Sequence, residues 1–214
     1  MTVVSLKIVN SRKTELLEAE FSDGSRLLFS GDYLPEDMKP DSRNHDSWNY
    51  NSLEGRDLAA WEEEAFRFAA RCYLAEKAAL RLIARAEQNS LGLTAKLERR
   101  GYDASVVKAV ISRLLGRNLL NDERYAELWI RSCLARKTQS PLWLLASLQK
   151  RGIDRDTAKR TIKKVLDEET EYSLLLKYIE KIDILDNNIK NGSKTKLKCE
   201  GFSPEILNRF FDSI

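Results

Sequence analysis

Apolar and polar positions alternate near the start of this 214-residue chain. Val4, Leu6 and Ile8 are separated by polar residues, and residues 17–21 show the same alternation. A period of two is typical of a half-buried β-strand whose apolar side chains share one face. An Asp-Gly pair at 23–24 leads into a further apolar run, which predicts a hairpin turn. We therefore expect a small N-terminal β-hairpin or meander.

The pattern changes twice after this β-patterned start. Residues 35–56 are polar and rich in Pro, Asn, Ser and Asp, which predicts a loop or short helical pieces. The only histidine, His45, lies in this segment, where we expect it to be exposed to solvent. From about Leu58 onward the apolar residues recur at i, i+3, i+4 and i+7, the spacing of amphipathic helices.

A seven-residue pattern occurs three times in the helical part of the chain. Each copy has a glycine, then a large apolar residue, then Asp, Asp or Ser. Glycine ends a helix in the left-handed conformation at low cost, and Asp or Ser is a preferred N-cap of the following helix. The copies are residues 97–103, 148–154 and 197–203, whose fifth residues are Gly101, Gly152 and Gly201.

Each glycine is followed by a segment with one apolar helical face. Each face has four positions at i, i+3, i+4 and i+7, and they start at the same offset from the glycine in every copy. Tyr73, Tyr125 and Tyr172 precede the three glycines at nearly equal separations, which extends the self-similarity into the preceding helices. The four positions hold Val107, Val110, Ile111 and Leu114 in the first copy, Ala158, Thr161, Ile162 and Val165 in the second, and Leu207, Phe210, Phe211 and Ile214 in the third.

These patterns predict a mainly α protein of three tandem three-helix repeats with a small N-terminal β-meander. We place the repeats at residues 58–118, 119–166 and 167–214, after a β-patterned extension and polar linker at residues 1–57. A short helix cannot bury its apolar face alone, so each repeat must pack its own helices together and stack on its neighbours. The expected arrangement is an elongated, curved array.

The net charge of +3 conceals an uneven distribution of charge. Residues 65–166 carry 22 Lys and Arg against 9 Asp and Glu, whereas residues 1–64 carry 7 against 14 and residues 167–214 carry 7 against 10. The excess of positive charge in residues 65–166 indicates a polyanion or an acidic protein surface as the binding partner. The acidic N-terminal part is also a candidate intramolecular partner for the basic repeats.

Motifs that carry catalysis or bind a cofactor are missing from the sequence. A single histidine excludes a multi-histidine metal site, and no G-x-x-x-x-G-K phosphate loop occurs. The acidic groups at residues 122–123 and 167–169 fit helix N-termini, where the macrodipole favours carboxylates. We predict a protein that is not an enzyme and has no metal and no cofactor.

The sequence also predicts a cellular compartment. Cys72, Cys133 and Cys199 are odd in number and widely spaced, which favours reduced, buried thiols over disulfides or zinc ligands. Charged residues interrupt every apolar stretch well short of the length that a membrane span needs. The N-terminus lacks the pattern of a signal peptide. We therefore expect a cytoplasmic protein with no membrane contact.

Basic residues of the first two repeats are the candidate binding residues. The second repeat places several of them on the polar side of the helix that contains Ile162. Such a stripe of positive charge can bind phosphates or an acidic protein surface, although an ordinary solvated helix face has the same pattern. If these residues contact DNA, binding should weaken strongly as the salt concentration rises. The candidates are Arg99, Arg100, Arg136, Lys137, Lys150, Arg151, Arg155, Lys159, Arg160, Lys163 and Lys164.

Four positions in the second repeat hold apolar or aromatic side chains that admit two interpretations. Tyr125, Trp129, Cys133 and Trp143 fit packing between helices better than platforms for stacked bases. Trp143 is the exception that we would test first for stacking. It falls at the third helical position after the Ser140 cap, where partial exposure is expected.

Several stretches resemble the bacterial RecX regulators. Residues 79–87 and 97–102 look like the first repeat of that family, and residues 119–127 are similar to its link between repeats. Residues 150–153 match the end of its second repeat. The resemblance covers residues 75–166 well and residues 167–214 loosely, whereas the β-patterned start lies outside it.

The resemblance implies a modulator of RecA, the recombinase that polymerises on single-stranded DNA. Members of the family lie in the groove of the RecA–DNA filament, bridge neighbouring protomers, and suppress strand exchange, ATP hydrolysis and repressor cleavage. The implied partner is the RecA filament, with single- and double-stranded DNA as further candidates and the chain acting as a monomer. The alternatives are a sequence-independent DNA-binding module and a helical-repeat scaffold for another protein.

The third repeat departs from the family pattern. Glu200 stands where the first two copies have Arg100 and Arg151. Residues 187–193 are rich in turn formers, whereas the second copy has a simple Ser140-Pro141 helix start. We therefore expect binding in the first two repeats and a closing, end-capping role for the third.

Overall fold

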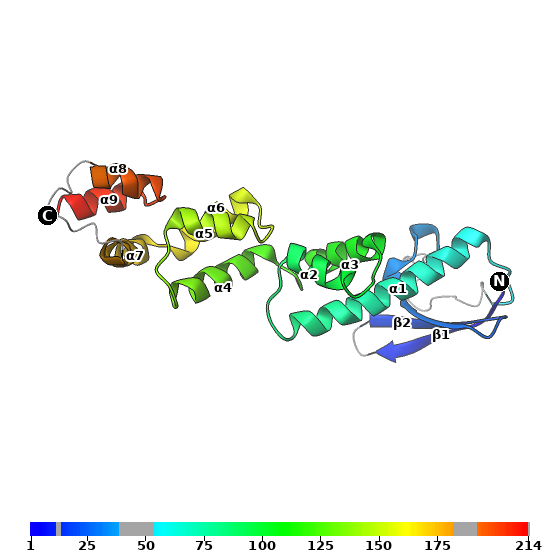
Figure 1. Cartoon of the computed structure of the whole chain (residues 1–214). Coiled ribbons are helices and arrows are strands. Elements are labelled where there is room, and N and C mark those ends of the chain that lie inside the picture. The colour runs from blue at the N-terminus through cyan, green and yellow to red at the C-terminus, as the bar shows by residue number, and fades with distance from the viewer. Residues whose placement is uncertain (12–13, 39–53, 182–191, 214) are drawn as a thin grey trace. The chain divides into compact units, whose positions relative to one another are not determined.

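A computed structural model describes residues 1–11, 14–38, 54–181 and 192–213. The chain is mainly helical with one small antiparallel sheet, as predicted (Figure 1). It divides into two compact units. We call Met1–Ala86 with Leu93–Leu119 the N-terminal unit, and Glu87–Gly92 with Leu120–Ile214 the C-terminal unit. His45 and residues 187–191 of the turn-rich stretch lie outside the described residues.

The predicted β-meander is present in the N-terminal unit. Its strands pair antiparallel in the order β1-β2-β3, and Gly24 at φ +78° allows the turn between β2 and β3. Asp23 supports this turn because its Oδ1 accepts a 2.9 Å hydrogen bond from the backbone N–H of Ser25. The strands are β1 (Val3–Ser11), β2 (Thr14–Phe21) and β3 (Arg26–Ser30).

One detail of the strand prediction is wrong. The register of β1 against β2 shifts between Val3 and Ser5, as in a β-bulge. Because the bulge inserts one residue, Val3 and Leu6 are buried on the core side and Val4 is 56% exposed. Ile8 is also exposed, on an edge strand of the sheet. Val4, Leu6 and Ile8 therefore do not share one buried face.

The sheet packs on the long helix α1 (Ala60–Ile83) (Figure 1). Phe66 of α1 meets Phe21 and Phe29 edge-to-face, with ring centroids 6.0 and 5.2 Å apart. Such pairs add to the stabilisation that burial of the rings provides. The meander is therefore an integral part of the N-terminal unit.

One acidic residue of the N-terminal segment also pairs with basic residues of the first helical repeat. Asp32 lies in the short 3-10 helix Gly31–Tyr33 and forms ion pairs with Arg113 and Arg117. Arg113 also lies 3.3 Å from Glu76, which accepts a 2.9 Å hydrogen bond from the Tyr33 hydroxyl. The proposed intramolecular partnership is thus present at this point.

The helices described here come in three successive sets of three. They are α1, α2 (Ser90–Glu98) and α3 (Ala104–Gly116); α4 (Asp122–Leu134), α5 (Pro141–Gln149) and α6 (Arg155–Val165); and α7 (Glu168–Lys181), α8 (Gly192–Cys199) and α9 (Pro204–Phe211). Tyr73, Tyr125 and Tyr172 lie on the first helix of each set. The proposed boundaries of the repeats as separate domains stay a prediction, since the compact units do not follow them.

The predicted caps form in part. Asp154 accepts hydrogen bonds from the backbone N–H groups of Asp156 and Thr157. Asp103 and Ser203 occupy the same N-cap position but make no side-chain cap bond. Asp103 lies 3.5 Å from Arg71, and the Ser203 hydroxyl instead donates to Glu171. Tertiary partners therefore replace the local caps there.

The predicted apolar faces of the first two copies are buried with one systematic exception. In the first two copies, the first, second and fourth positions of each face are fully or almost fully buried. The third position, Ile111 or Ile162, is only half-buried. This third position lines a groove in each of the two units. In the third copy Leu207 is buried, Phe210 and Phe211 are half-buried, and Ile214 lies outside the described residues.

The glycine turns do more than end helices. A Cβ on Gly152 would lie 2.6 Å from the Cβ of Leu91, and one on Gly201 would lie 3.0 Å from the backbone nitrogen of Leu142. Both glycines have positive φ, at +81° and +91°. Leu91 and Leu142 occupy equivalent places at the starts of α2 and α5. The turn of one repeat thus packs against the second helix of the preceding repeat.

Hydrogen bonds accompany both contacts. The side-chain amide of Asn89 donates to the carbonyl oxygen of Arg151, just before Gly152. The N–H of Leu142 donates to the carbonyl oxygen of Glu200, just before Gly201, over 2.9 Å. Only glycine combines the left-handed conformation with this close approach.

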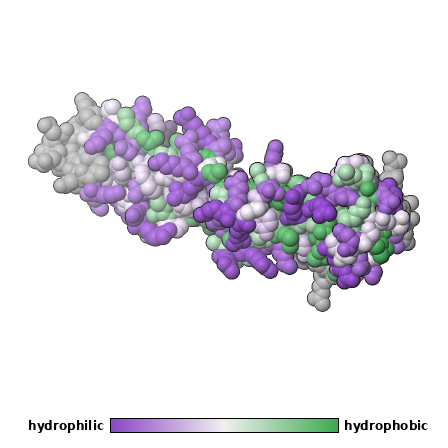
Figure 2. Space-filling view, turned by 45° about the vertical axis from the view of Figure 1, so that its right-hand side comes forward, coloured by the Kyte–Doolittle hydropathy of each residue, from purple (hydrophilic) through white to green (hydrophobic). Residues whose placement is uncertain are grey.

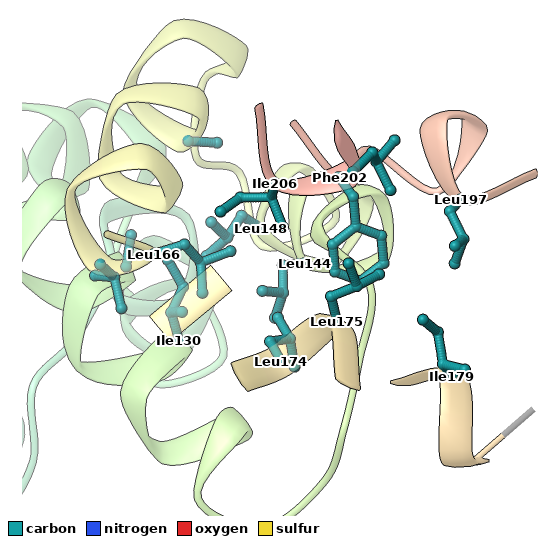
Figure 3. Close-up of a cluster of buried hydrophobic side chains, with 14 of the residues drawn as sticks. Ile130, Leu144, Leu148, Leu166, Leu174, Leu175, Ile179, Leu197, Phe202 and Ile206 are labelled. Carbon is teal, nitrogen blue, oxygen red and sulfur yellow. The ribbon is translucent and has the colours of Figure 1, made fainter. Parts of the chain in front are cut away.

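One hydrophobic core runs through α4 to α9 of the C-terminal unit (Figure 3). Figure 3 shows Leu144 and Leu148 of α5 close to Ile206 of α9, with Leu174 and Leu175 of α7 below them. Phe202 stacks at a tilt against Tyr178, with ring centroids 5.4 Å apart. The second and third sets of helices therefore share buried side chains.

Candidate functional site

Most of the predicted basic residues lie in the C-terminal unit. Arg99 and Arg100 follow α2 in the N-terminal unit, and the other nine belong to α6 or to the ends of α4 and α5. All are exposed except Arg151, which is half-buried. Figure 2 shows hydrophilic residues over much of the visible face, with hydrophobic residues in small groups between them.

Helix α6 displays the densest part of this basic surface. Ala158, Thr161 and Val165 are buried, so the intervening positions turn outward. The Asp154 cap fixes the start of the helix, and its hydrogen bond from Thr157 holds the pKa of the carboxyl below the ordinary value of 3.8. The exposed basic residues of α6 are Arg155, Lys159, Arg160, Lys163 and Lys164.

Some of these side chains already have partners. Lys164 lies 2.9 Å from Glu127 of α4, which also pairs with Arg131. The hydrogen bond from Lys164, with that from Arg131, lowers the pKa of Glu127. Arg160 donates to the hydroxyl of Thr157 over 3.1 Å. These contacts hold the two basic side chains against the protein.

Other predicted residues carry a charge that is free of such contacts. Within the part of the chain that the structure describes, six of them form no ion pair or side-chain hydrogen bond. A charge without an internal partner is available to a macromolecular one. The six are Arg100, Lys137, Lys150, Arg155, Lys159 and Lys163.

Arg151 has a structural contact instead. Its guanidinium lies over the Trp129 ring at 4.3 Å from the centroid, and it donates to the carbonyl oxygen of Ser147 over 2.8 Å. The Trp143 ring is stacked on Trp129, with centroids 6.1 Å apart and planes 20° apart. Trp143 itself is 42% exposed, as the sequence suggested. Tyr125, Trp129 and Cys133 pack against the core, which confirms the packing prediction for these three.

Two of the free lysines line a groove that the sequence did not reveal. A cavity of about 690 Å³ lies between α5, α6 and the starts of α7 and α9. Lys159 and Lys163 line it together with Ile162, and Glu168 and Glu205 add acidic groups. The apolar side chains that line it are Pro141, Leu142, Leu145, Ile162, Leu166 and Ile206.

An equivalent groove of about 430 Å³ occurs in the N-terminal unit. Lys108, Ile111 and Leu115 line it at the positions that Lys159, Ile162 and Leu166 hold in the second copy. The only signal in the sequence was the third apolar position after each glycine. The acidic wall of the larger groove comes from the third repeat, so periodicity within one repeat could not predict it.

Other candidate chemistry is sparse. No group of three or more His, Cys, Asp or Glu among the described residues could hold a metal ion. Burial raises the pKa of the Cys72 thiol to about 12. Cys199 is exposed, so the prediction that all three cysteines are buried is wrong; buried Leu197 lies two residues earlier, and Cys199 falls on the outer side of α8. Among the described helices, none has the length and apolar character of a membrane span.

Sequence comparisons connect the chain to one group of regulators. Residues 121–162 match the family described as RecX, second three-helix domain. The chain is 36% identical over 142 residues to the regulatory protein RecX of Treponema pallidum (strain Nichols), which covers 66% of this chain and 77% of that relative. It is 41% identical over 76 residues to regulatory protein RecX of Halorhodospira halophila, covering 36% of this chain and 47% of that relative.

Solved structures show the same fold. A crystal structure of regulatory protein RecX aligns over 100% of both chains, with a TM-score of 0.62 and 16% identity. A crystal structure of RecX from Lactobacillus salivarius aligns over 67% of this chain and 98% of that chain, with a TM-score of 0.52 and 23% identity. At these identities the likeness is one of fold alone.

Proposed function

The chain belongs to the RecX family of regulatory proteins, and from this premise we propose that it binds the RecA–DNA filament and inhibits the recombinase. The proposed effects are reduced strand exchange, ATP hydrolysis and RecA-stimulated repressor cleavage. The protein would thereby regulate recombination and DNA repair. We propose that it does so as a non-enzymatic monomer in the cytoplasm.

The observation that carries this proposal is the set of unpaired basic side chains on α6. Lys159 and Lys163 lie on one exposed side of α6. Lys159 is within residues 121–162, the segment that matches the family's second three-helix domain, and Lys163 is the residue that follows this segment. Exposed charges of one sign speed the encounter with a partner of opposite charge. A filament of nucleic acid and protein offers such a partner repeatedly along its length, so several weak contacts add through effective concentration.

The decisive experiment measures RecA activity with and without the chain. DNA-dependent ATP hydrolysis and strand exchange should both fall as the chain is titrated toward the RecA concentration. No change in either activity at equimolar concentration would contradict the proposal.

A pair of variants tests the α6 surface. Lys159→Glu combined with Lys163→Glu should weaken inhibition by roughly tenfold, since it reverses two charges that face the partner. Lys177→Glu with Lys198→Glu is the matched control because it makes the same change in net charge on exposed residues of α7 and α8. Equal loss of inhibition in both double variants would show that net charge matters and the α6 surface does not.

A second candidate function is sequence-independent DNA binding as the main activity. The exposed charges of Arg100, Lys137 and Lys150 favour it, because phosphates need only an accessible cation. DNA affinity measured without RecA should then fall steeply with salt, and inhibition of RecA should follow DNA affinity across salt concentrations. Inhibition that persists at salt where DNA binding is lost would favour direct contact with the recombinase.

A further inference from the structure

The exposed face of Trp143 and the basic side chains around it have no role in the inhibition proposed above. Trp143 begins the outer face of α5, and its ring is stacked on Trp129 of α4. Among the tryptophans of described structure, Trp129 is half-buried and packs against the core, whereas Trp143 is 42% exposed. The half-buried Trp129 ring, which packs against the core, therefore supports the more exposed Trp143 ring.

This support matters because a rigid aromatic ring is a better platform than a mobile one. The Trp129 ring is held in turn by the Arg151 guanidinium at 4.3 Å from its centroid. Arg151 is fixed by its hydrogen bond to the Ser147 carbonyl oxygen. Trp143 thus loses little conformational freedom when a further flat group stacks on it.

The charges near this pair of rings are mostly positive. Arg136 lies two helical turns after Trp129, just past the end of α4. Its guanidinium donates hydrogen bonds to the carbonyl oxygen and the hydroxyl of Ser132, which lies between Arg136 and Trp129 in the sequence. Lys150 lies two turns after Trp143 on the same side of α5 and has no partner among the described residues. The Lys181 ammonium donates to the carbonyl oxygen of Thr138, just before α5.

Acidic groups are fewer on this surface. Helix α5 contains none, and the positions three and four residues from Trp129 on α4 are also free of them. Asp122 lies two turns before Trp129 on α4, but its carboxylate already accepts hydrogen bonds from the backbone N–H and the hydroxyl of Ser90. Glu200 lies at the start of α5, where its carbonyl oxygen accepts a 2.9 Å hydrogen bond from the backbone N–H of Leu142. An exposed aromatic ring flanked by cations suits a ligand that joins flat rings to phosphates.

We propose that Trp143 is a base-stacking platform for single-stranded nucleic acid, with Lys150 and Arg136 placed to contact the neighbouring phosphates. A duplex does not fit this description because its bases are already stacked on one another and present only their edges. The site requires no recombinase. Binding at this site can therefore be tested independently of the inhibition of RecA.

The test compares two single-stranded probes that share a backbone. One is an oligothymidylate and the other is an abasic oligonucleotide of the same length. The unmodified chain should bind oligothymidylate more tightly, and Trp143→Ala should reduce that affinity by about tenfold while leaving the affinity for the abasic probe unchanged. Trp143→Phe should retain much of the affinity because it keeps an aromatic face.

Two further variants separate stacking from charge and from loss of structure. Trp61→Ala is the matched control because Trp61 is 53% exposed on α1 of the other unit, and it should change neither affinity. Lys150→Glu should reduce the dependence of affinity on salt, whereas Trp143→Ala should leave that dependence intact. A duplex probe should bind equally well to the unmodified chain and to Trp143→Ala.

The proposal is overturned if Trp143→Ala weakens binding to both single-stranded probes equally, since that would indicate a structural role. It is also overturned if the unmodified chain does not distinguish the two probes, or if Trp143→Ala leaves oligothymidylate binding unchanged. Preferential binding of the base-containing probe that vanishes only in Trp143→Ala supports it.

Discussion

The same ion pair occurs in the first two sets of helices, but in very different surroundings. A basic residue on the third helix of the set meets an acidic residue on the first, at matching places in the repeat: Arg113 with Glu76 in the first set, and Lys164 with Glu127 in the second. Arg113 and Glu76 are 13% and 9% exposed at their side chains, whereas Lys164 and Glu127 are 58% and 25% exposed.

The difference arises from the N-terminal segment. Asp32 and Tyr33 cover the pair in the first set and extend it into a network. No equivalent segment precedes the second set, so its pair and the polar side of α6 remain open to solvent. One helical framework therefore supports a buried structural network in one place and an accessible basic surface in another.

The glycine turns differ between the same two sets. Nothing lies within 4 Å of a Cβ built on Gly101, whereas Gly152 touches Leu91. Gly101 belongs to the first repeat, which has no earlier repeat to contact. The two glycines share a left-handed conformation, at φ +86° and +81°, and differ only in the contact.

The largest expected effect separates these two glycines. Gly152→Ala should lower the free energy of unfolding by about 4 kcal/mol, because the strain of positive φ adds to the overlap with Leu91. Gly101→Ala should cost only about 1 kcal/mol, from the strain alone. Urea denaturation of both variants measures the difference, and equal losses would show that the contact with Leu91 has no energetic weight.

The next effect separates the two ion pairs. Arg113→Gln should lower the free energy of unfolding by about 3 kcal/mol because it leaves the buried carboxylate of Glu76 without its cation. Lys164→Gln should change stability only slightly, since the pair on α4 and α6 is exposed and screened by water. Thermal or urea denaturation would contradict this interpretation if Lys164→Gln were the more damaging change.

A smaller effect concerns equivalent buried positions on α3 and α6. Thr161 is fully buried, and its hydroxyl has no hydrogen-bond partner among the described residues, whereas Val110 holds the same position in the first set. Thr161→Val should raise the free energy of unfolding by about 1 kcal/mol because it removes an unsatisfied polar atom. The reverse change, Val110→Thr, is the control and should destabilise. If Thr161→Val did not raise the free energy of unfolding, the Thr161 hydroxyl would have a hydrogen-bond partner in solution.

The smallest effect is a dependence of stability on pH that arises from Asp32, the residue that covers the pair in the first set. Burial alone would raise the pKa of Asp32, but hydrogen bonds from Arg113 and Ser30 outweigh it and hold that pKa below the ordinary value of 3.8. The carboxylate therefore contributes stability at pH values above 3.8, and this contribution is lost as the pH falls through the lowered pKa. Asp32→Asn should flatten the acid side of the stability profile. An unchanged profile would contradict the assignment.

Much of the fold follows from the sequence because its signals are local. Periodicity located the helices and strands, and the repeated glycines located the turns. The bulge that exposes Val4 was not predictable, since it depends on register with another strand. The missing cap bonds at Asp103 and Ser203 have a similar cause, because partners distant in sequence, Arg71 and Glu171, compete for those side chains.

The candidate surface was predictable in composition but not in arrangement. Charge counting identified the basic residues, yet it could not show that Lys164 is held by Glu127 while Lys159 and Lys163 are free. The contact of Arg151 with Trp129 was likewise hidden, because the two residues lie on different helices. The N-terminal pairing of Asp32 with Arg113 was indicated only by the opposite charges of the two regions.

The core that α4 to α9 share couples the last two sets of helices during unfolding. Removing residues after Leu166 would expose Leu144 and Leu148, which Ile206 and its neighbours now cover (Figure 3). Backbone amides of α5 should accordingly exchange with solvent hydrogen only when the third set opens as well. The third set of helices is thus one half of a cooperative folding unit, whatever it contributes at the molecular surface.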